Sequence, residues 1–241
     1  MKSRVKVLAL LALALCAQAC AAGNLADLTI YDRTEGKRLP VYWHGGRAYV
    51  AGKPGNEYQV SVRSRLGEDL LAVVSVDGVN AVTGQTADAS QSGYVLSPSG
   101  AVDIQGWRKS LSETAAFYFT SLGDSYAART GRPENVGVIG VALFRRKQEP
   151  AAQIAPIEKR EASRDGASAP RAEAQIGTGH GRLEAAYARY VSFERASSTP
   201  AEILTVYYDS RANLVARGII RTPVPVAPHP RPFPGFVPDP A

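Results

Sequence analysis

Apolar residues in the first two-thirds of the chain recur in short runs at β spacing rather than at helical spacing. From Tyr58 to Arg63 apolar and polar residues alternate, which predicts a strand with one buried face. Residues 70–76 are continuously apolar, apart from one serine, as expected of a strand buried on both faces. Further β-rich runs occupy residues 28–31, 41–43, 47–50, 79–82, 94–96, 102–107, 115–120 and 136–144. About nine short strands, separated by Gly, Pro, Asn or Asp, predict an all-β fold: an antiparallel β-sandwich over residues 23–146.

Three local features refine this prediction. The dipeptide Asp77-Gly78 lies between two apolar runs and is typical of a tight hairpin turn. One short helix is expected over residues 124–130, with Asp124 as its N-terminal cap. Trp107 is expected to be buried against the strand that contains Phe117.

The chain changes character after residue 146. Residues 147–175 are rich in Ala, Glu, Arg and Ser and almost free of aromatic and β-branched residues, which is typical of a disordered linker. A β-rich pattern resumes in residues 176–221. It predicts strands at residues 187–195 and 203–208. A turn at residues 209–213 then leads into a returning strand at residues 214–220. Because a hairpin alone is marginally stable in water, this C-terminal β-hairpin is expected to dock on the sandwich.

The last part of the chain is a proline-rich tail. Residues 222–241 contain eight of the sixteen prolines. Their Pro-x-Pro spacing favours an extended polyproline conformation without internal hydrogen bonds. We interpret the tail as a solvated segment; the alternative is a spacer or docking peptide for another envelope component, with Phe233 and Phe236 as anchors.

The first 22 residues have the pattern of a secretory signal peptide. Three basic residues precede the apolar run 7–16, which is too short to span a bilayer comfortably as a helix. Ala17-Gln18-Ala19 then supplies small residues at the positions that a signal peptidase reads. The sequence therefore predicts export to the periplasm or the extracellular space.

Both cysteines of the chain, Cys16 and Cys20, lie in or beside this segment. Once the signal is removed, the folded part has no internal disulfide, thiolate metal site or cysteine nucleophile. Cys20 is a candidate for lipidation, which would make the chain a membrane-anchored lipoprotein. Ala17 stands where a lipoprotein signal usually has Leu, so the sequence favours ordinary cleavage after Ala19 or Ala21.

The charge balance does not indicate nucleic-acid binding. The formal net charge is +6, from 28 basic and 22 acidic residues. Three of the basic residues leave with the signal, so 25 remain against 22 acidic ones. A net charge this small, without basic runs interleaved with aromatics, predicts no nucleic-acid partner.

The run Gly123-Asp124-Ser125-Tyr126 resembles the nucleophile block of the GDSL, or SGNH, hydrolases. That chemistry needs a histidine base and an acidic residue that orients it. In the family these lie in an Asp-x-x-His motif, whereas none of the three histidines here has an acidic residue three positions before it. Ser125 is therefore interpreted as a helix-start residue, and no catalytic residue is assigned.

Metal and cofactor chemistry has equally little support. Three scattered histidines and no cysteine in the mature fold are not typical of a zinc site, and no calcium-loop motif is present. No metal site and no cofactor are predicted. Asp77, Asp103 and Glu113 could form an acid–base pair only if the fold brought them together.

The run from Gly177 to Arg182 contains three glycines, at positions 177, 179 and 181. Such glycines let a backbone approach a ligand closely, and His180 with Arg182 could meet an anion. The run lacks the ending of a phosphate loop, and a tight loop entering a strand needs the same glycines. We expect a structural loop, and name His180 and Arg182 as the first candidates for ligand binding.

Several blocks of the chain carry a family resemblance. They are Val73-Val74-Ser75-Val76-Asp77-Gly78-Val79-Asn80, Gly93-Tyr94-Val95-Leu96, Gly106-Trp107-Arg108, Phe117-Tyr118-Phe119, Gly137-Val138-Ile139-Gly140, the glycine run above and Phe193-Glu194-Arg195. Together they resemble a family of uncharacterised exported proteins from Gram-negative bacteria, over about two-thirds of the chain. The resemblance implies an all-β envelope protein and carries no activity, cofactor or catalytic residue.

These observations favour a non-enzymatic cell-envelope protein, a β-sandwich that binds an unknown envelope protein or ligand. The alternatives are a hydrolase acting on cell-wall or carbohydrate substrates and a structural component of a secreted assembly. Two convergent carboxylates, or His180 beside Ser125, would indicate the enzyme. A broad apolar surface or an unpaired sheet edge would indicate an interaction role.

Overall fold

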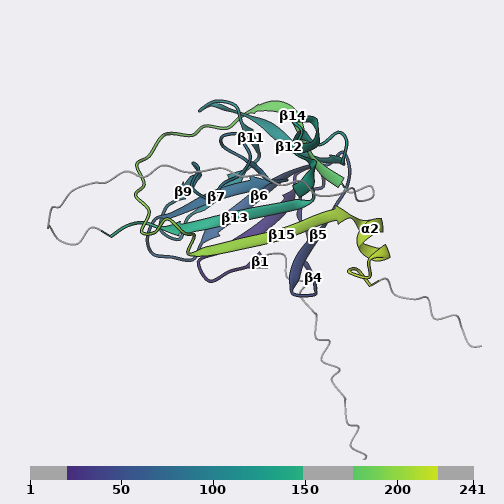
Figure 1. The fold of residues 1–241 in the computed structure, drawn as a ribbon, viewed down its shortest axis with the longest axis horizontal. Coiled ribbons are helices and arrows are strands. Elements are labelled where there is room, and N and C mark those ends of the chain that lie inside the picture. Colours follow the sequence, from purple (N-terminus) through teal and green to yellow (C-terminus); the bar gives the residue numbers. More distant parts are fainter. Residues whose placement is uncertain (1–20, 149–175, 222–241) are drawn as a thin grey trace, which may run out of the picture.

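The computed structural model describes residues 21–148 and 176–221. Residues 1–20, with Cys16 and Cys20, lie outside this part of the chain. So do nearly all of the predicted linker and the whole proline-rich tail. The described residues form a mostly β structure of two sheets, whose strands run in two layers (Figure 1).

The first sheet has eight strands in the order β1-β2-β6-β12-β11, with β3 paired to β2, β10 to β6 and β14 to β12. All of these pairs are antiparallel. The strands are β1 (Ala21–Ala22), β2 (Ala26–Asp32), β3 (Lys37–Arg38), β6 (Glu57–Ser64), β10 (Ala101–Ile104), β11 (Gly106–Arg108), β12 (Glu113–Ser121) and β14 (Ile176–Ala185).

The second sheet has seven strands in the order β4-β5-β15-β13-β7-β8, with β9 paired to β7. The strands are β4 (Tyr42–His44), β5 (Arg47–Gly52), β7 (Leu70–Val76), β8 (Val79–Asn80), β9 (Tyr94–Leu96), β13 (Val138–Arg145) and β15 (Glu202–Ser210). β15 pairs with β5 in parallel, so the prediction of a purely antiparallel arrangement is wrong for this sheet.

One hydrophobic core is shared by the two sheets, as the alternating pattern predicts. On β6 the side chains of Tyr58, Val60 and Val62 are fully buried, while the residues between them face outward. They join a single cluster that also contains residues of β7, β13 and β15 from the other sheet. Each large apolar side chain buried in this way stabilises the fold by about 1.5–3 kcal/mol. The continuously apolar β7 is buried on both faces, as predicted.

The predicted local features are also present. Asp77 and Gly78 both have positive φ, 53° and 73°, and join β7 to β8 as a tight hairpin. The short helix α1 (Tyr126–Arg129) lies where expected, but Ser125 rather than Asp124 caps it, by accepting a hydrogen bond from the Ala128 amide at 3.1 Å. It is followed by a turn of 3-10 helix, η1 (Pro133–Asn135).

The predicted C-terminal hairpin is wrong. Within the described residues, no strand follows β15 and pairs with it as a hairpin. Instead, β15 lies inside the second sheet, between β5 and β13. Residues 214–220, expected to be a strand, belong to helix α2 (Arg211–Ala216) and the turns after it. Ser210 caps this helix by accepting a hydrogen bond from the Asn213 amide, and Leu214 packs on Tyr49 outside the sheet.

The strand expected over residues 187–195 is also absent. This segment is extended but has no sheet partner except one isolated bridge between Arg195 and Arg146. It runs from the end of β14 towards β15, along the left side of the view in Figure 1. We call residues 186–195 the strap.

Candidate functional site

A groove opens between β9 of the second sheet, the β10–β11 segment of the first sheet and the strap. β6 and β12 pair only at two positions, Tyr58 with Phe117 and Glu57 with Tyr118, and then separate. The chain from Ala101 to Arg108 fills this fork, first along β6 as β10 and then along β12 as β11. The groove has a volume of about 1370 Å³ and is lined by residues of β7, β9, β10, β11 and the strap.

Backbone hydrogen bonds hold both ends of the strap. At one end the amides of Ala186 and Ala188 donate to the carbonyls of Ser112 and Leu111, in the turn between β11 and β12. At the other end the Lys147 amide donates to the Glu194 carbonyl. The strap therefore connects the ends of the two sheets across the groove.

Arginine side chains hold the strap at three further points. Arg108 donates to the carbonyl of Ala186, and Arg146 donates to the carbonyl of Ser192 at 3.1 Å. Arg195, on the strap itself, donates to Ala89 and Gln91 at 3.0 and 2.6 Å. These contacts fix a segment that has no regular secondary structure of its own.

Most of the large apolar side chains exposed in the described residues gather on or beside the strap. Tyr187 and Tyr190 are 87% and 88% exposed, and Val191 is also exposed. Leu111 and Leu183 are exposed on strands and turns that adjoin the strap. We call these five residues the apolar surface. All of them except Leu183 line the groove, and exposed apolar groups that line one groove are typical of an interaction site.

The charges that line the groove are unevenly paired. Asp69 is paired with Arg146 at 3.0 Å, and Glu194 is paired with Lys147. Lys109 and Arg189 line the groove and are exposed, and their side chains make no ion pair or hydrogen bond within the described residues. The groove therefore carries basic groups that no acidic group of the described chain neutralises.

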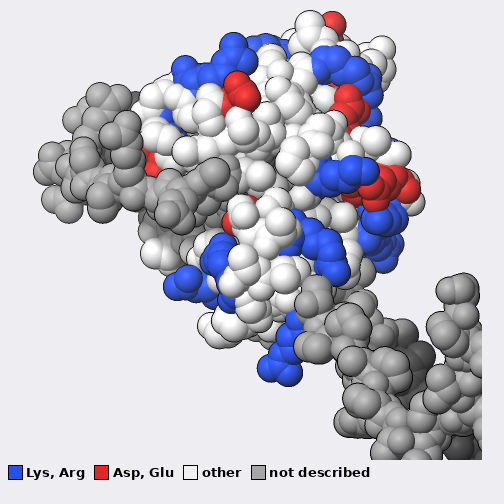
Figure 2. Space-filling view, turned by 90° about the vertical axis from the view of Figure 1, so that its right-hand side faces the viewer, with Lys and Arg blue, Asp and Glu red and all other residues white. Residues whose placement is uncertain are grey.

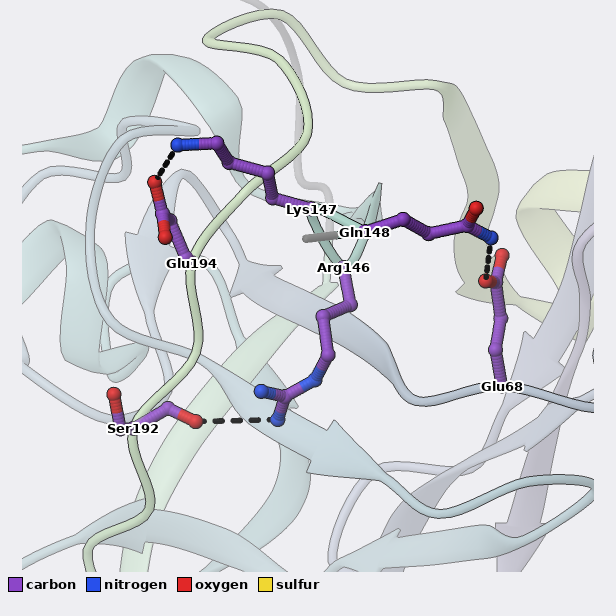
Figure 3. Close-up of a pocket in the computed structure, with 6 residues that line it drawn as sticks. All are labelled: Glu68, Arg146, Lys147, Gln148, Ser192 and Glu194. Carbon is purple, nitrogen blue, oxygen red and sulfur yellow. Dashed lines mark hydrogen bonds and ion pairs between the residues drawn. The ribbon is translucent and has the colours of Figure 1, made fainter. Parts of the chain in front are cut away.

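A smaller hollow of about 460 Å³ adjoins one end of the groove and shares Arg146 and Glu194 with it. Figure 3 shows that its polar side chains each face a partner, Arg146 for example the carbonyl of Ser192. Lys147 points to Glu194, and Gln148 donates to Glu68 at 3.4 Å. Because these groups already satisfy one another, the hollow offers less to a ligand than the groove does.

The opposite end of the molecule has a different charge pattern. Figure 2 shows basic side chains scattered over that face, with acidic side chains beside several of them. Paired charges of this kind contribute little to recognition because each already has its partner.

The predicted site residues His180 and Arg182 lie on a strand, not on a loop. Both belong to β14, so the expectation of a structural loop at 177–182 is wrong. Glycines at every second position place bare backbone on one face, where a β-carbon on Gly179 would lie 2.2 Å from the Tyr118 ring. The glycines serve the packing of β14 on β12.

The structure also does not bring these two residues together as an anion site. The ring of His180 lies against Tyr126, with centroids 5.6 Å apart, and partial burial together with the charge of Lys109 lowers the pKa of His180. Arg182 instead donates to both carboxylate oxygens of Glu57, at 2.8 and 2.9 Å, and lies 3.2 Å from Glu184. Two carboxylates already neutralise its charge.

Ser125 has the surroundings of a capping residue. It is fully buried, donates to the carbonyl of Leu122 at 2.7 Å, and accepts the amide of Ala128. Its interpretation as a helix-start residue is confirmed. Among residues 21–148 and 176–221, no group of three His, Cys, Asp or Glu could hold a metal ion.

The carboxylates considered as an acid–base pair have unlike surroundings. Asp77 is fully buried, whereas Asp103 and Glu113 are exposed. Asp103 accepts a hydrogen bond from Ser61 at 2.5 Å on the outer face of the first sheet.

A buried hydrogen-bonded chain links the two sheets at Asp77. The carboxylate of Asp77 accepts from the Tyr208 hydroxyl at 2.6 Å and from the amides of Thr178 and Gly137 at 2.7 and 2.9 Å. The Thr178 hydroxyl bridges Tyr208 and Tyr58 at 2.7 and 2.5 Å. Because the Tyr208 hydroxyl uses its hydrogen in the bond to Asp77, it can only accept from Thr178. The Thr178 hydroxyl therefore donates to Tyr208 and accepts the hydrogen bond from Tyr58.

Burial raises the pKa of Asp77 to about 6, although its hydrogen bonds, that from Tyr208 first, act in the opposite direction. From the sequence, Asp77 was predicted as a turn residue and considered as one of three possible acid–base carboxylates. Nothing in the spacing of the four residues in the sequence signals that they meet, because they come from four separate strands or turns.

The comparisons with known proteins add no relative. No family model, no curated protein and no solved structure matches this chain. Within the described residues, no helix is long and apolar enough to cross a membrane.

Proposed function

We propose that this chain is an exported, non-enzymatic cell-envelope protein, a β-sandwich that binds a partner through the groove and the strap. One observation carries the proposal. Five of the seven large hydrophobic side chains exposed in the described residues form the apolar surface on and beside the strap. Leaving such groups in water has no benefit for the isolated fold, whereas burying them against a partner stabilises a complex.

The way the strap is held supports the same proposal. Its ends and its arginine contacts fix the backbone, while Tyr187 and Tyr190 point away from the fold and are almost fully exposed. Tyrosine is enriched at interfaces because its ring buries a large area at a low cost in conformational entropy. A fixed backbone that presents free tyrosines lowers the entropy lost on binding.

Export remains a proposal that rests on the N-terminal pattern of residues 1–22. The structure bears on one detail of processing. Ala21, in β1, has a buried side chain and pairs in register with Leu28 of β2. Cleavage after Ala19 would keep this residue, whereas cleavage after Ala21 would remove it. This supports the earlier of the two cleavage positions.

The binding role can be tested by site-specific photo-crosslinking in the intact cell. A photoreactive benzoylphenylalanine replaces Tyr190 in one variant and the exposed Trp43 of β4, away from the strap, in a control variant. The proposal expects a discrete crosslinked adduct at position 190 that is missing at position 43. The proposal fails if both positions give the same adducts or if position 190 gives none.

The cellular location of the protein needs a separate experiment. Wild-type cells and cells with Cys20→Ser are fractionated side by side. The proposal expects processed protein in the soluble envelope fraction for both. Membrane-bound wild type together with soluble or unprocessed Cys20→Ser would instead show a lipoprotein tethered through Cys20.

A further inference from the structure

The charges of the groove select the kind of ligand that it can take. Lys109 and Arg189 line it without a partner in the described residues. Arg108 and Arg195 also line it, and their guanidinium groups donate hydrogen bonds to backbone carbonyls rather than to carboxylates. Against these stands Asp103, the one lining acid of the described chain without an ion pair. The groove therefore complements an anionic ligand.

The edge of β10, whose Val102 and Asp103 line the groove, offers main-chain groups that no second strand pairs within the described residues. The Ser64 amide donates to the Gly100 carbonyl, so the residues that face β6 are Gly100, Val102 and Ile104. The amides and carbonyls of Ala101 and Asp103 consequently point away from β6, and no hydrogen bond within the described residues engages them. A short free edge of this kind can pair with an extended peptide backbone.

The apolar surface narrows the choice further. Besides two tyrosines it presents Leu111, Leu183 and Val191, which are aliphatic. Sugar rings stack on aromatic faces but gain little from aliphatic side chains, whereas peptide side chains bury well against both. The charge of the groove, the free backbone edge and the apolar surface thus all suit a peptide ligand.

We infer that the groove binds an extended acidic peptide segment of a partner protein, one that carries apolar side chains between its carboxylates. This inference rests on the proposed binding function. The peptide backbone pairs with the edge at Ala101 and Asp103, its carboxylates meet Lys109 and Arg189, and its apolar side chains cover Tyr187 and Tyr190.

Fluorescence anisotropy with synthetic peptides tests the inference. The probe is a labelled peptide of about ten residues in which Glu, Ser and Val or Leu alternate. The comparison peptides replace every Glu with Lys or with Gln. Polygalacturonate and anionic phosphatidylglycerol vesicles serve as non-peptide anions. Binding is measured at low and high salt, because attraction between exposed charges weakens as ionic strength rises.

Paired variants locate the binding. Lys109→Ala with Arg189→Ala removes the unpaired charges, and Tyr187→Ala with Tyr190→Ala removes the aromatic rings. All four side chains are exposed, so thermal melting is expected to match wild type. The matched controls are Arg211→Ala, an exposed cation on α2, and Trp43→Ala, an exposed aromatic residue on β4.

The inference expects the acidic peptide to bind more tightly than the Gln and Lys peptides, with affinity falling at high salt. Each pair of substitutions is expected to weaken this binding by about tenfold or more, and the controls to leave it unchanged. Equal binding of the Lys peptide, or tighter binding of polygalacturonate or vesicles, overturns the inference. If the photo-crosslink at position 190 forms while the acidic peptide fails to bind, the proposed function stands and this inference is wrong.

Discussion

Asp77→Asn tests the buried link between the two sheets. The substitution keeps the size of the side chain and suits the turn, because Asn tolerates the positive φ of 53° at this position. It removes the charge and one of the acceptors that meet Tyr208, Thr178 and Gly137. A loss of about 1–3 kcal/mol in unfolding free energy, the same at every pH, is expected from the donor group that is left without an acceptor.

The informative quantity is how the difference between the two proteins changes with pH. Asp77 has a pKa of about 6 in the folded protein, against an ordinary value of 3.8, so folding favours its protonated form. A shift of about two units corresponds to about 3 kcal/mol. The stability that this group contributes is present below pH 3.8 and is lost as pH rises through about 6. Asn does not titrate and lacks this loss.

The assay is urea unfolding of wild type and Asp77→Asn at intervals between pH 4 and 7.5. Relative to the variant, wild type is expected to lose about 3 kcal/mol of unfolding free energy over this range. Groups common to both proteins, such as Glu35, whose hydrogen bond from Lys37 helps to lower its pKa to about 2, cancel in the difference. A difference that is flat, or that grows in favour of wild type with rising pH, would refute the reasoning.

A second variant checks the cause of the shift. Tyr208→Phe keeps the ring but removes the hydroxyl that donates to Asp77. Because this hydrogen bond lowers the pKa of Asp77, its loss is expected to raise that pKa and to move the transition to higher pH. An unchanged midpoint would show that the Tyr208 hydroxyl does not stabilise the carboxylate.

Three further substitutions test the packing. Trp107 is 3% exposed and meets Phe117 edge to face at 5.0 Å, so Trp107→Ala is expected to cost about 3–5 kcal/mol; an unchanged melting temperature would contradict this. Gly179→Ala places a methyl group 2.2 Å from the Tyr118 ring and is expected to cost about 1–3 kcal/mol of unfolding free energy, measured with denaturant. The same change at exposed Gly123, where a β-carbon would meet no atom within 4 Å, is expected to cost less. Ser125→Ala removes the α1 cap and is expected to cost about 1 kcal/mol in the same measurement, and an unaffected stability would show that the cap is dispensable.

Some of these features could be predicted from local patterns. Alternation identified β6, continuous apolarity identified β7, and Asp77-Gly78 identified the hairpin between β7 and β8. In each case the deciding interactions lie within one strand or one turn. The burial of Trp107 against Phe117 was also predicted and is confirmed.

The errors fall where the signal is ambiguous or distant. Residues 214–220 carry β-branched side chains, yet the Ser210 cap and the packing of Leu214 on Tyr49 favour a helix for the first part. Residues 187–195 are rich in residues typical of strands, but no partner strand is available to them. The glycines of β14 were interpreted as a loop, although their spacing of two is itself the signal of one face of a strand.

In the candidate site, too, the sequence shows which residues are present but not which of them are exposed. The tyrosines and arginines of the strap are visible in the sequence, but whether a tyrosine is buried or exposed depends on its neighbours in space.

By itself the sequence determined the β-rich character of the chain, its main strands and its tight turns, because side-chain alternation and turn chemistry act over a few residues. Only the tertiary structure decided that β15 is an inner strand of the second sheet, that Asp77 meets Tyr208 and Thr178, and that a groove opens between β9, β10, β11 and the strap. Those outcomes depend on which strands pair although they lie tens of residues to more than a hundred residues apart in the sequence. Local patterns specify that a strand needs a partner, but do not specify which one.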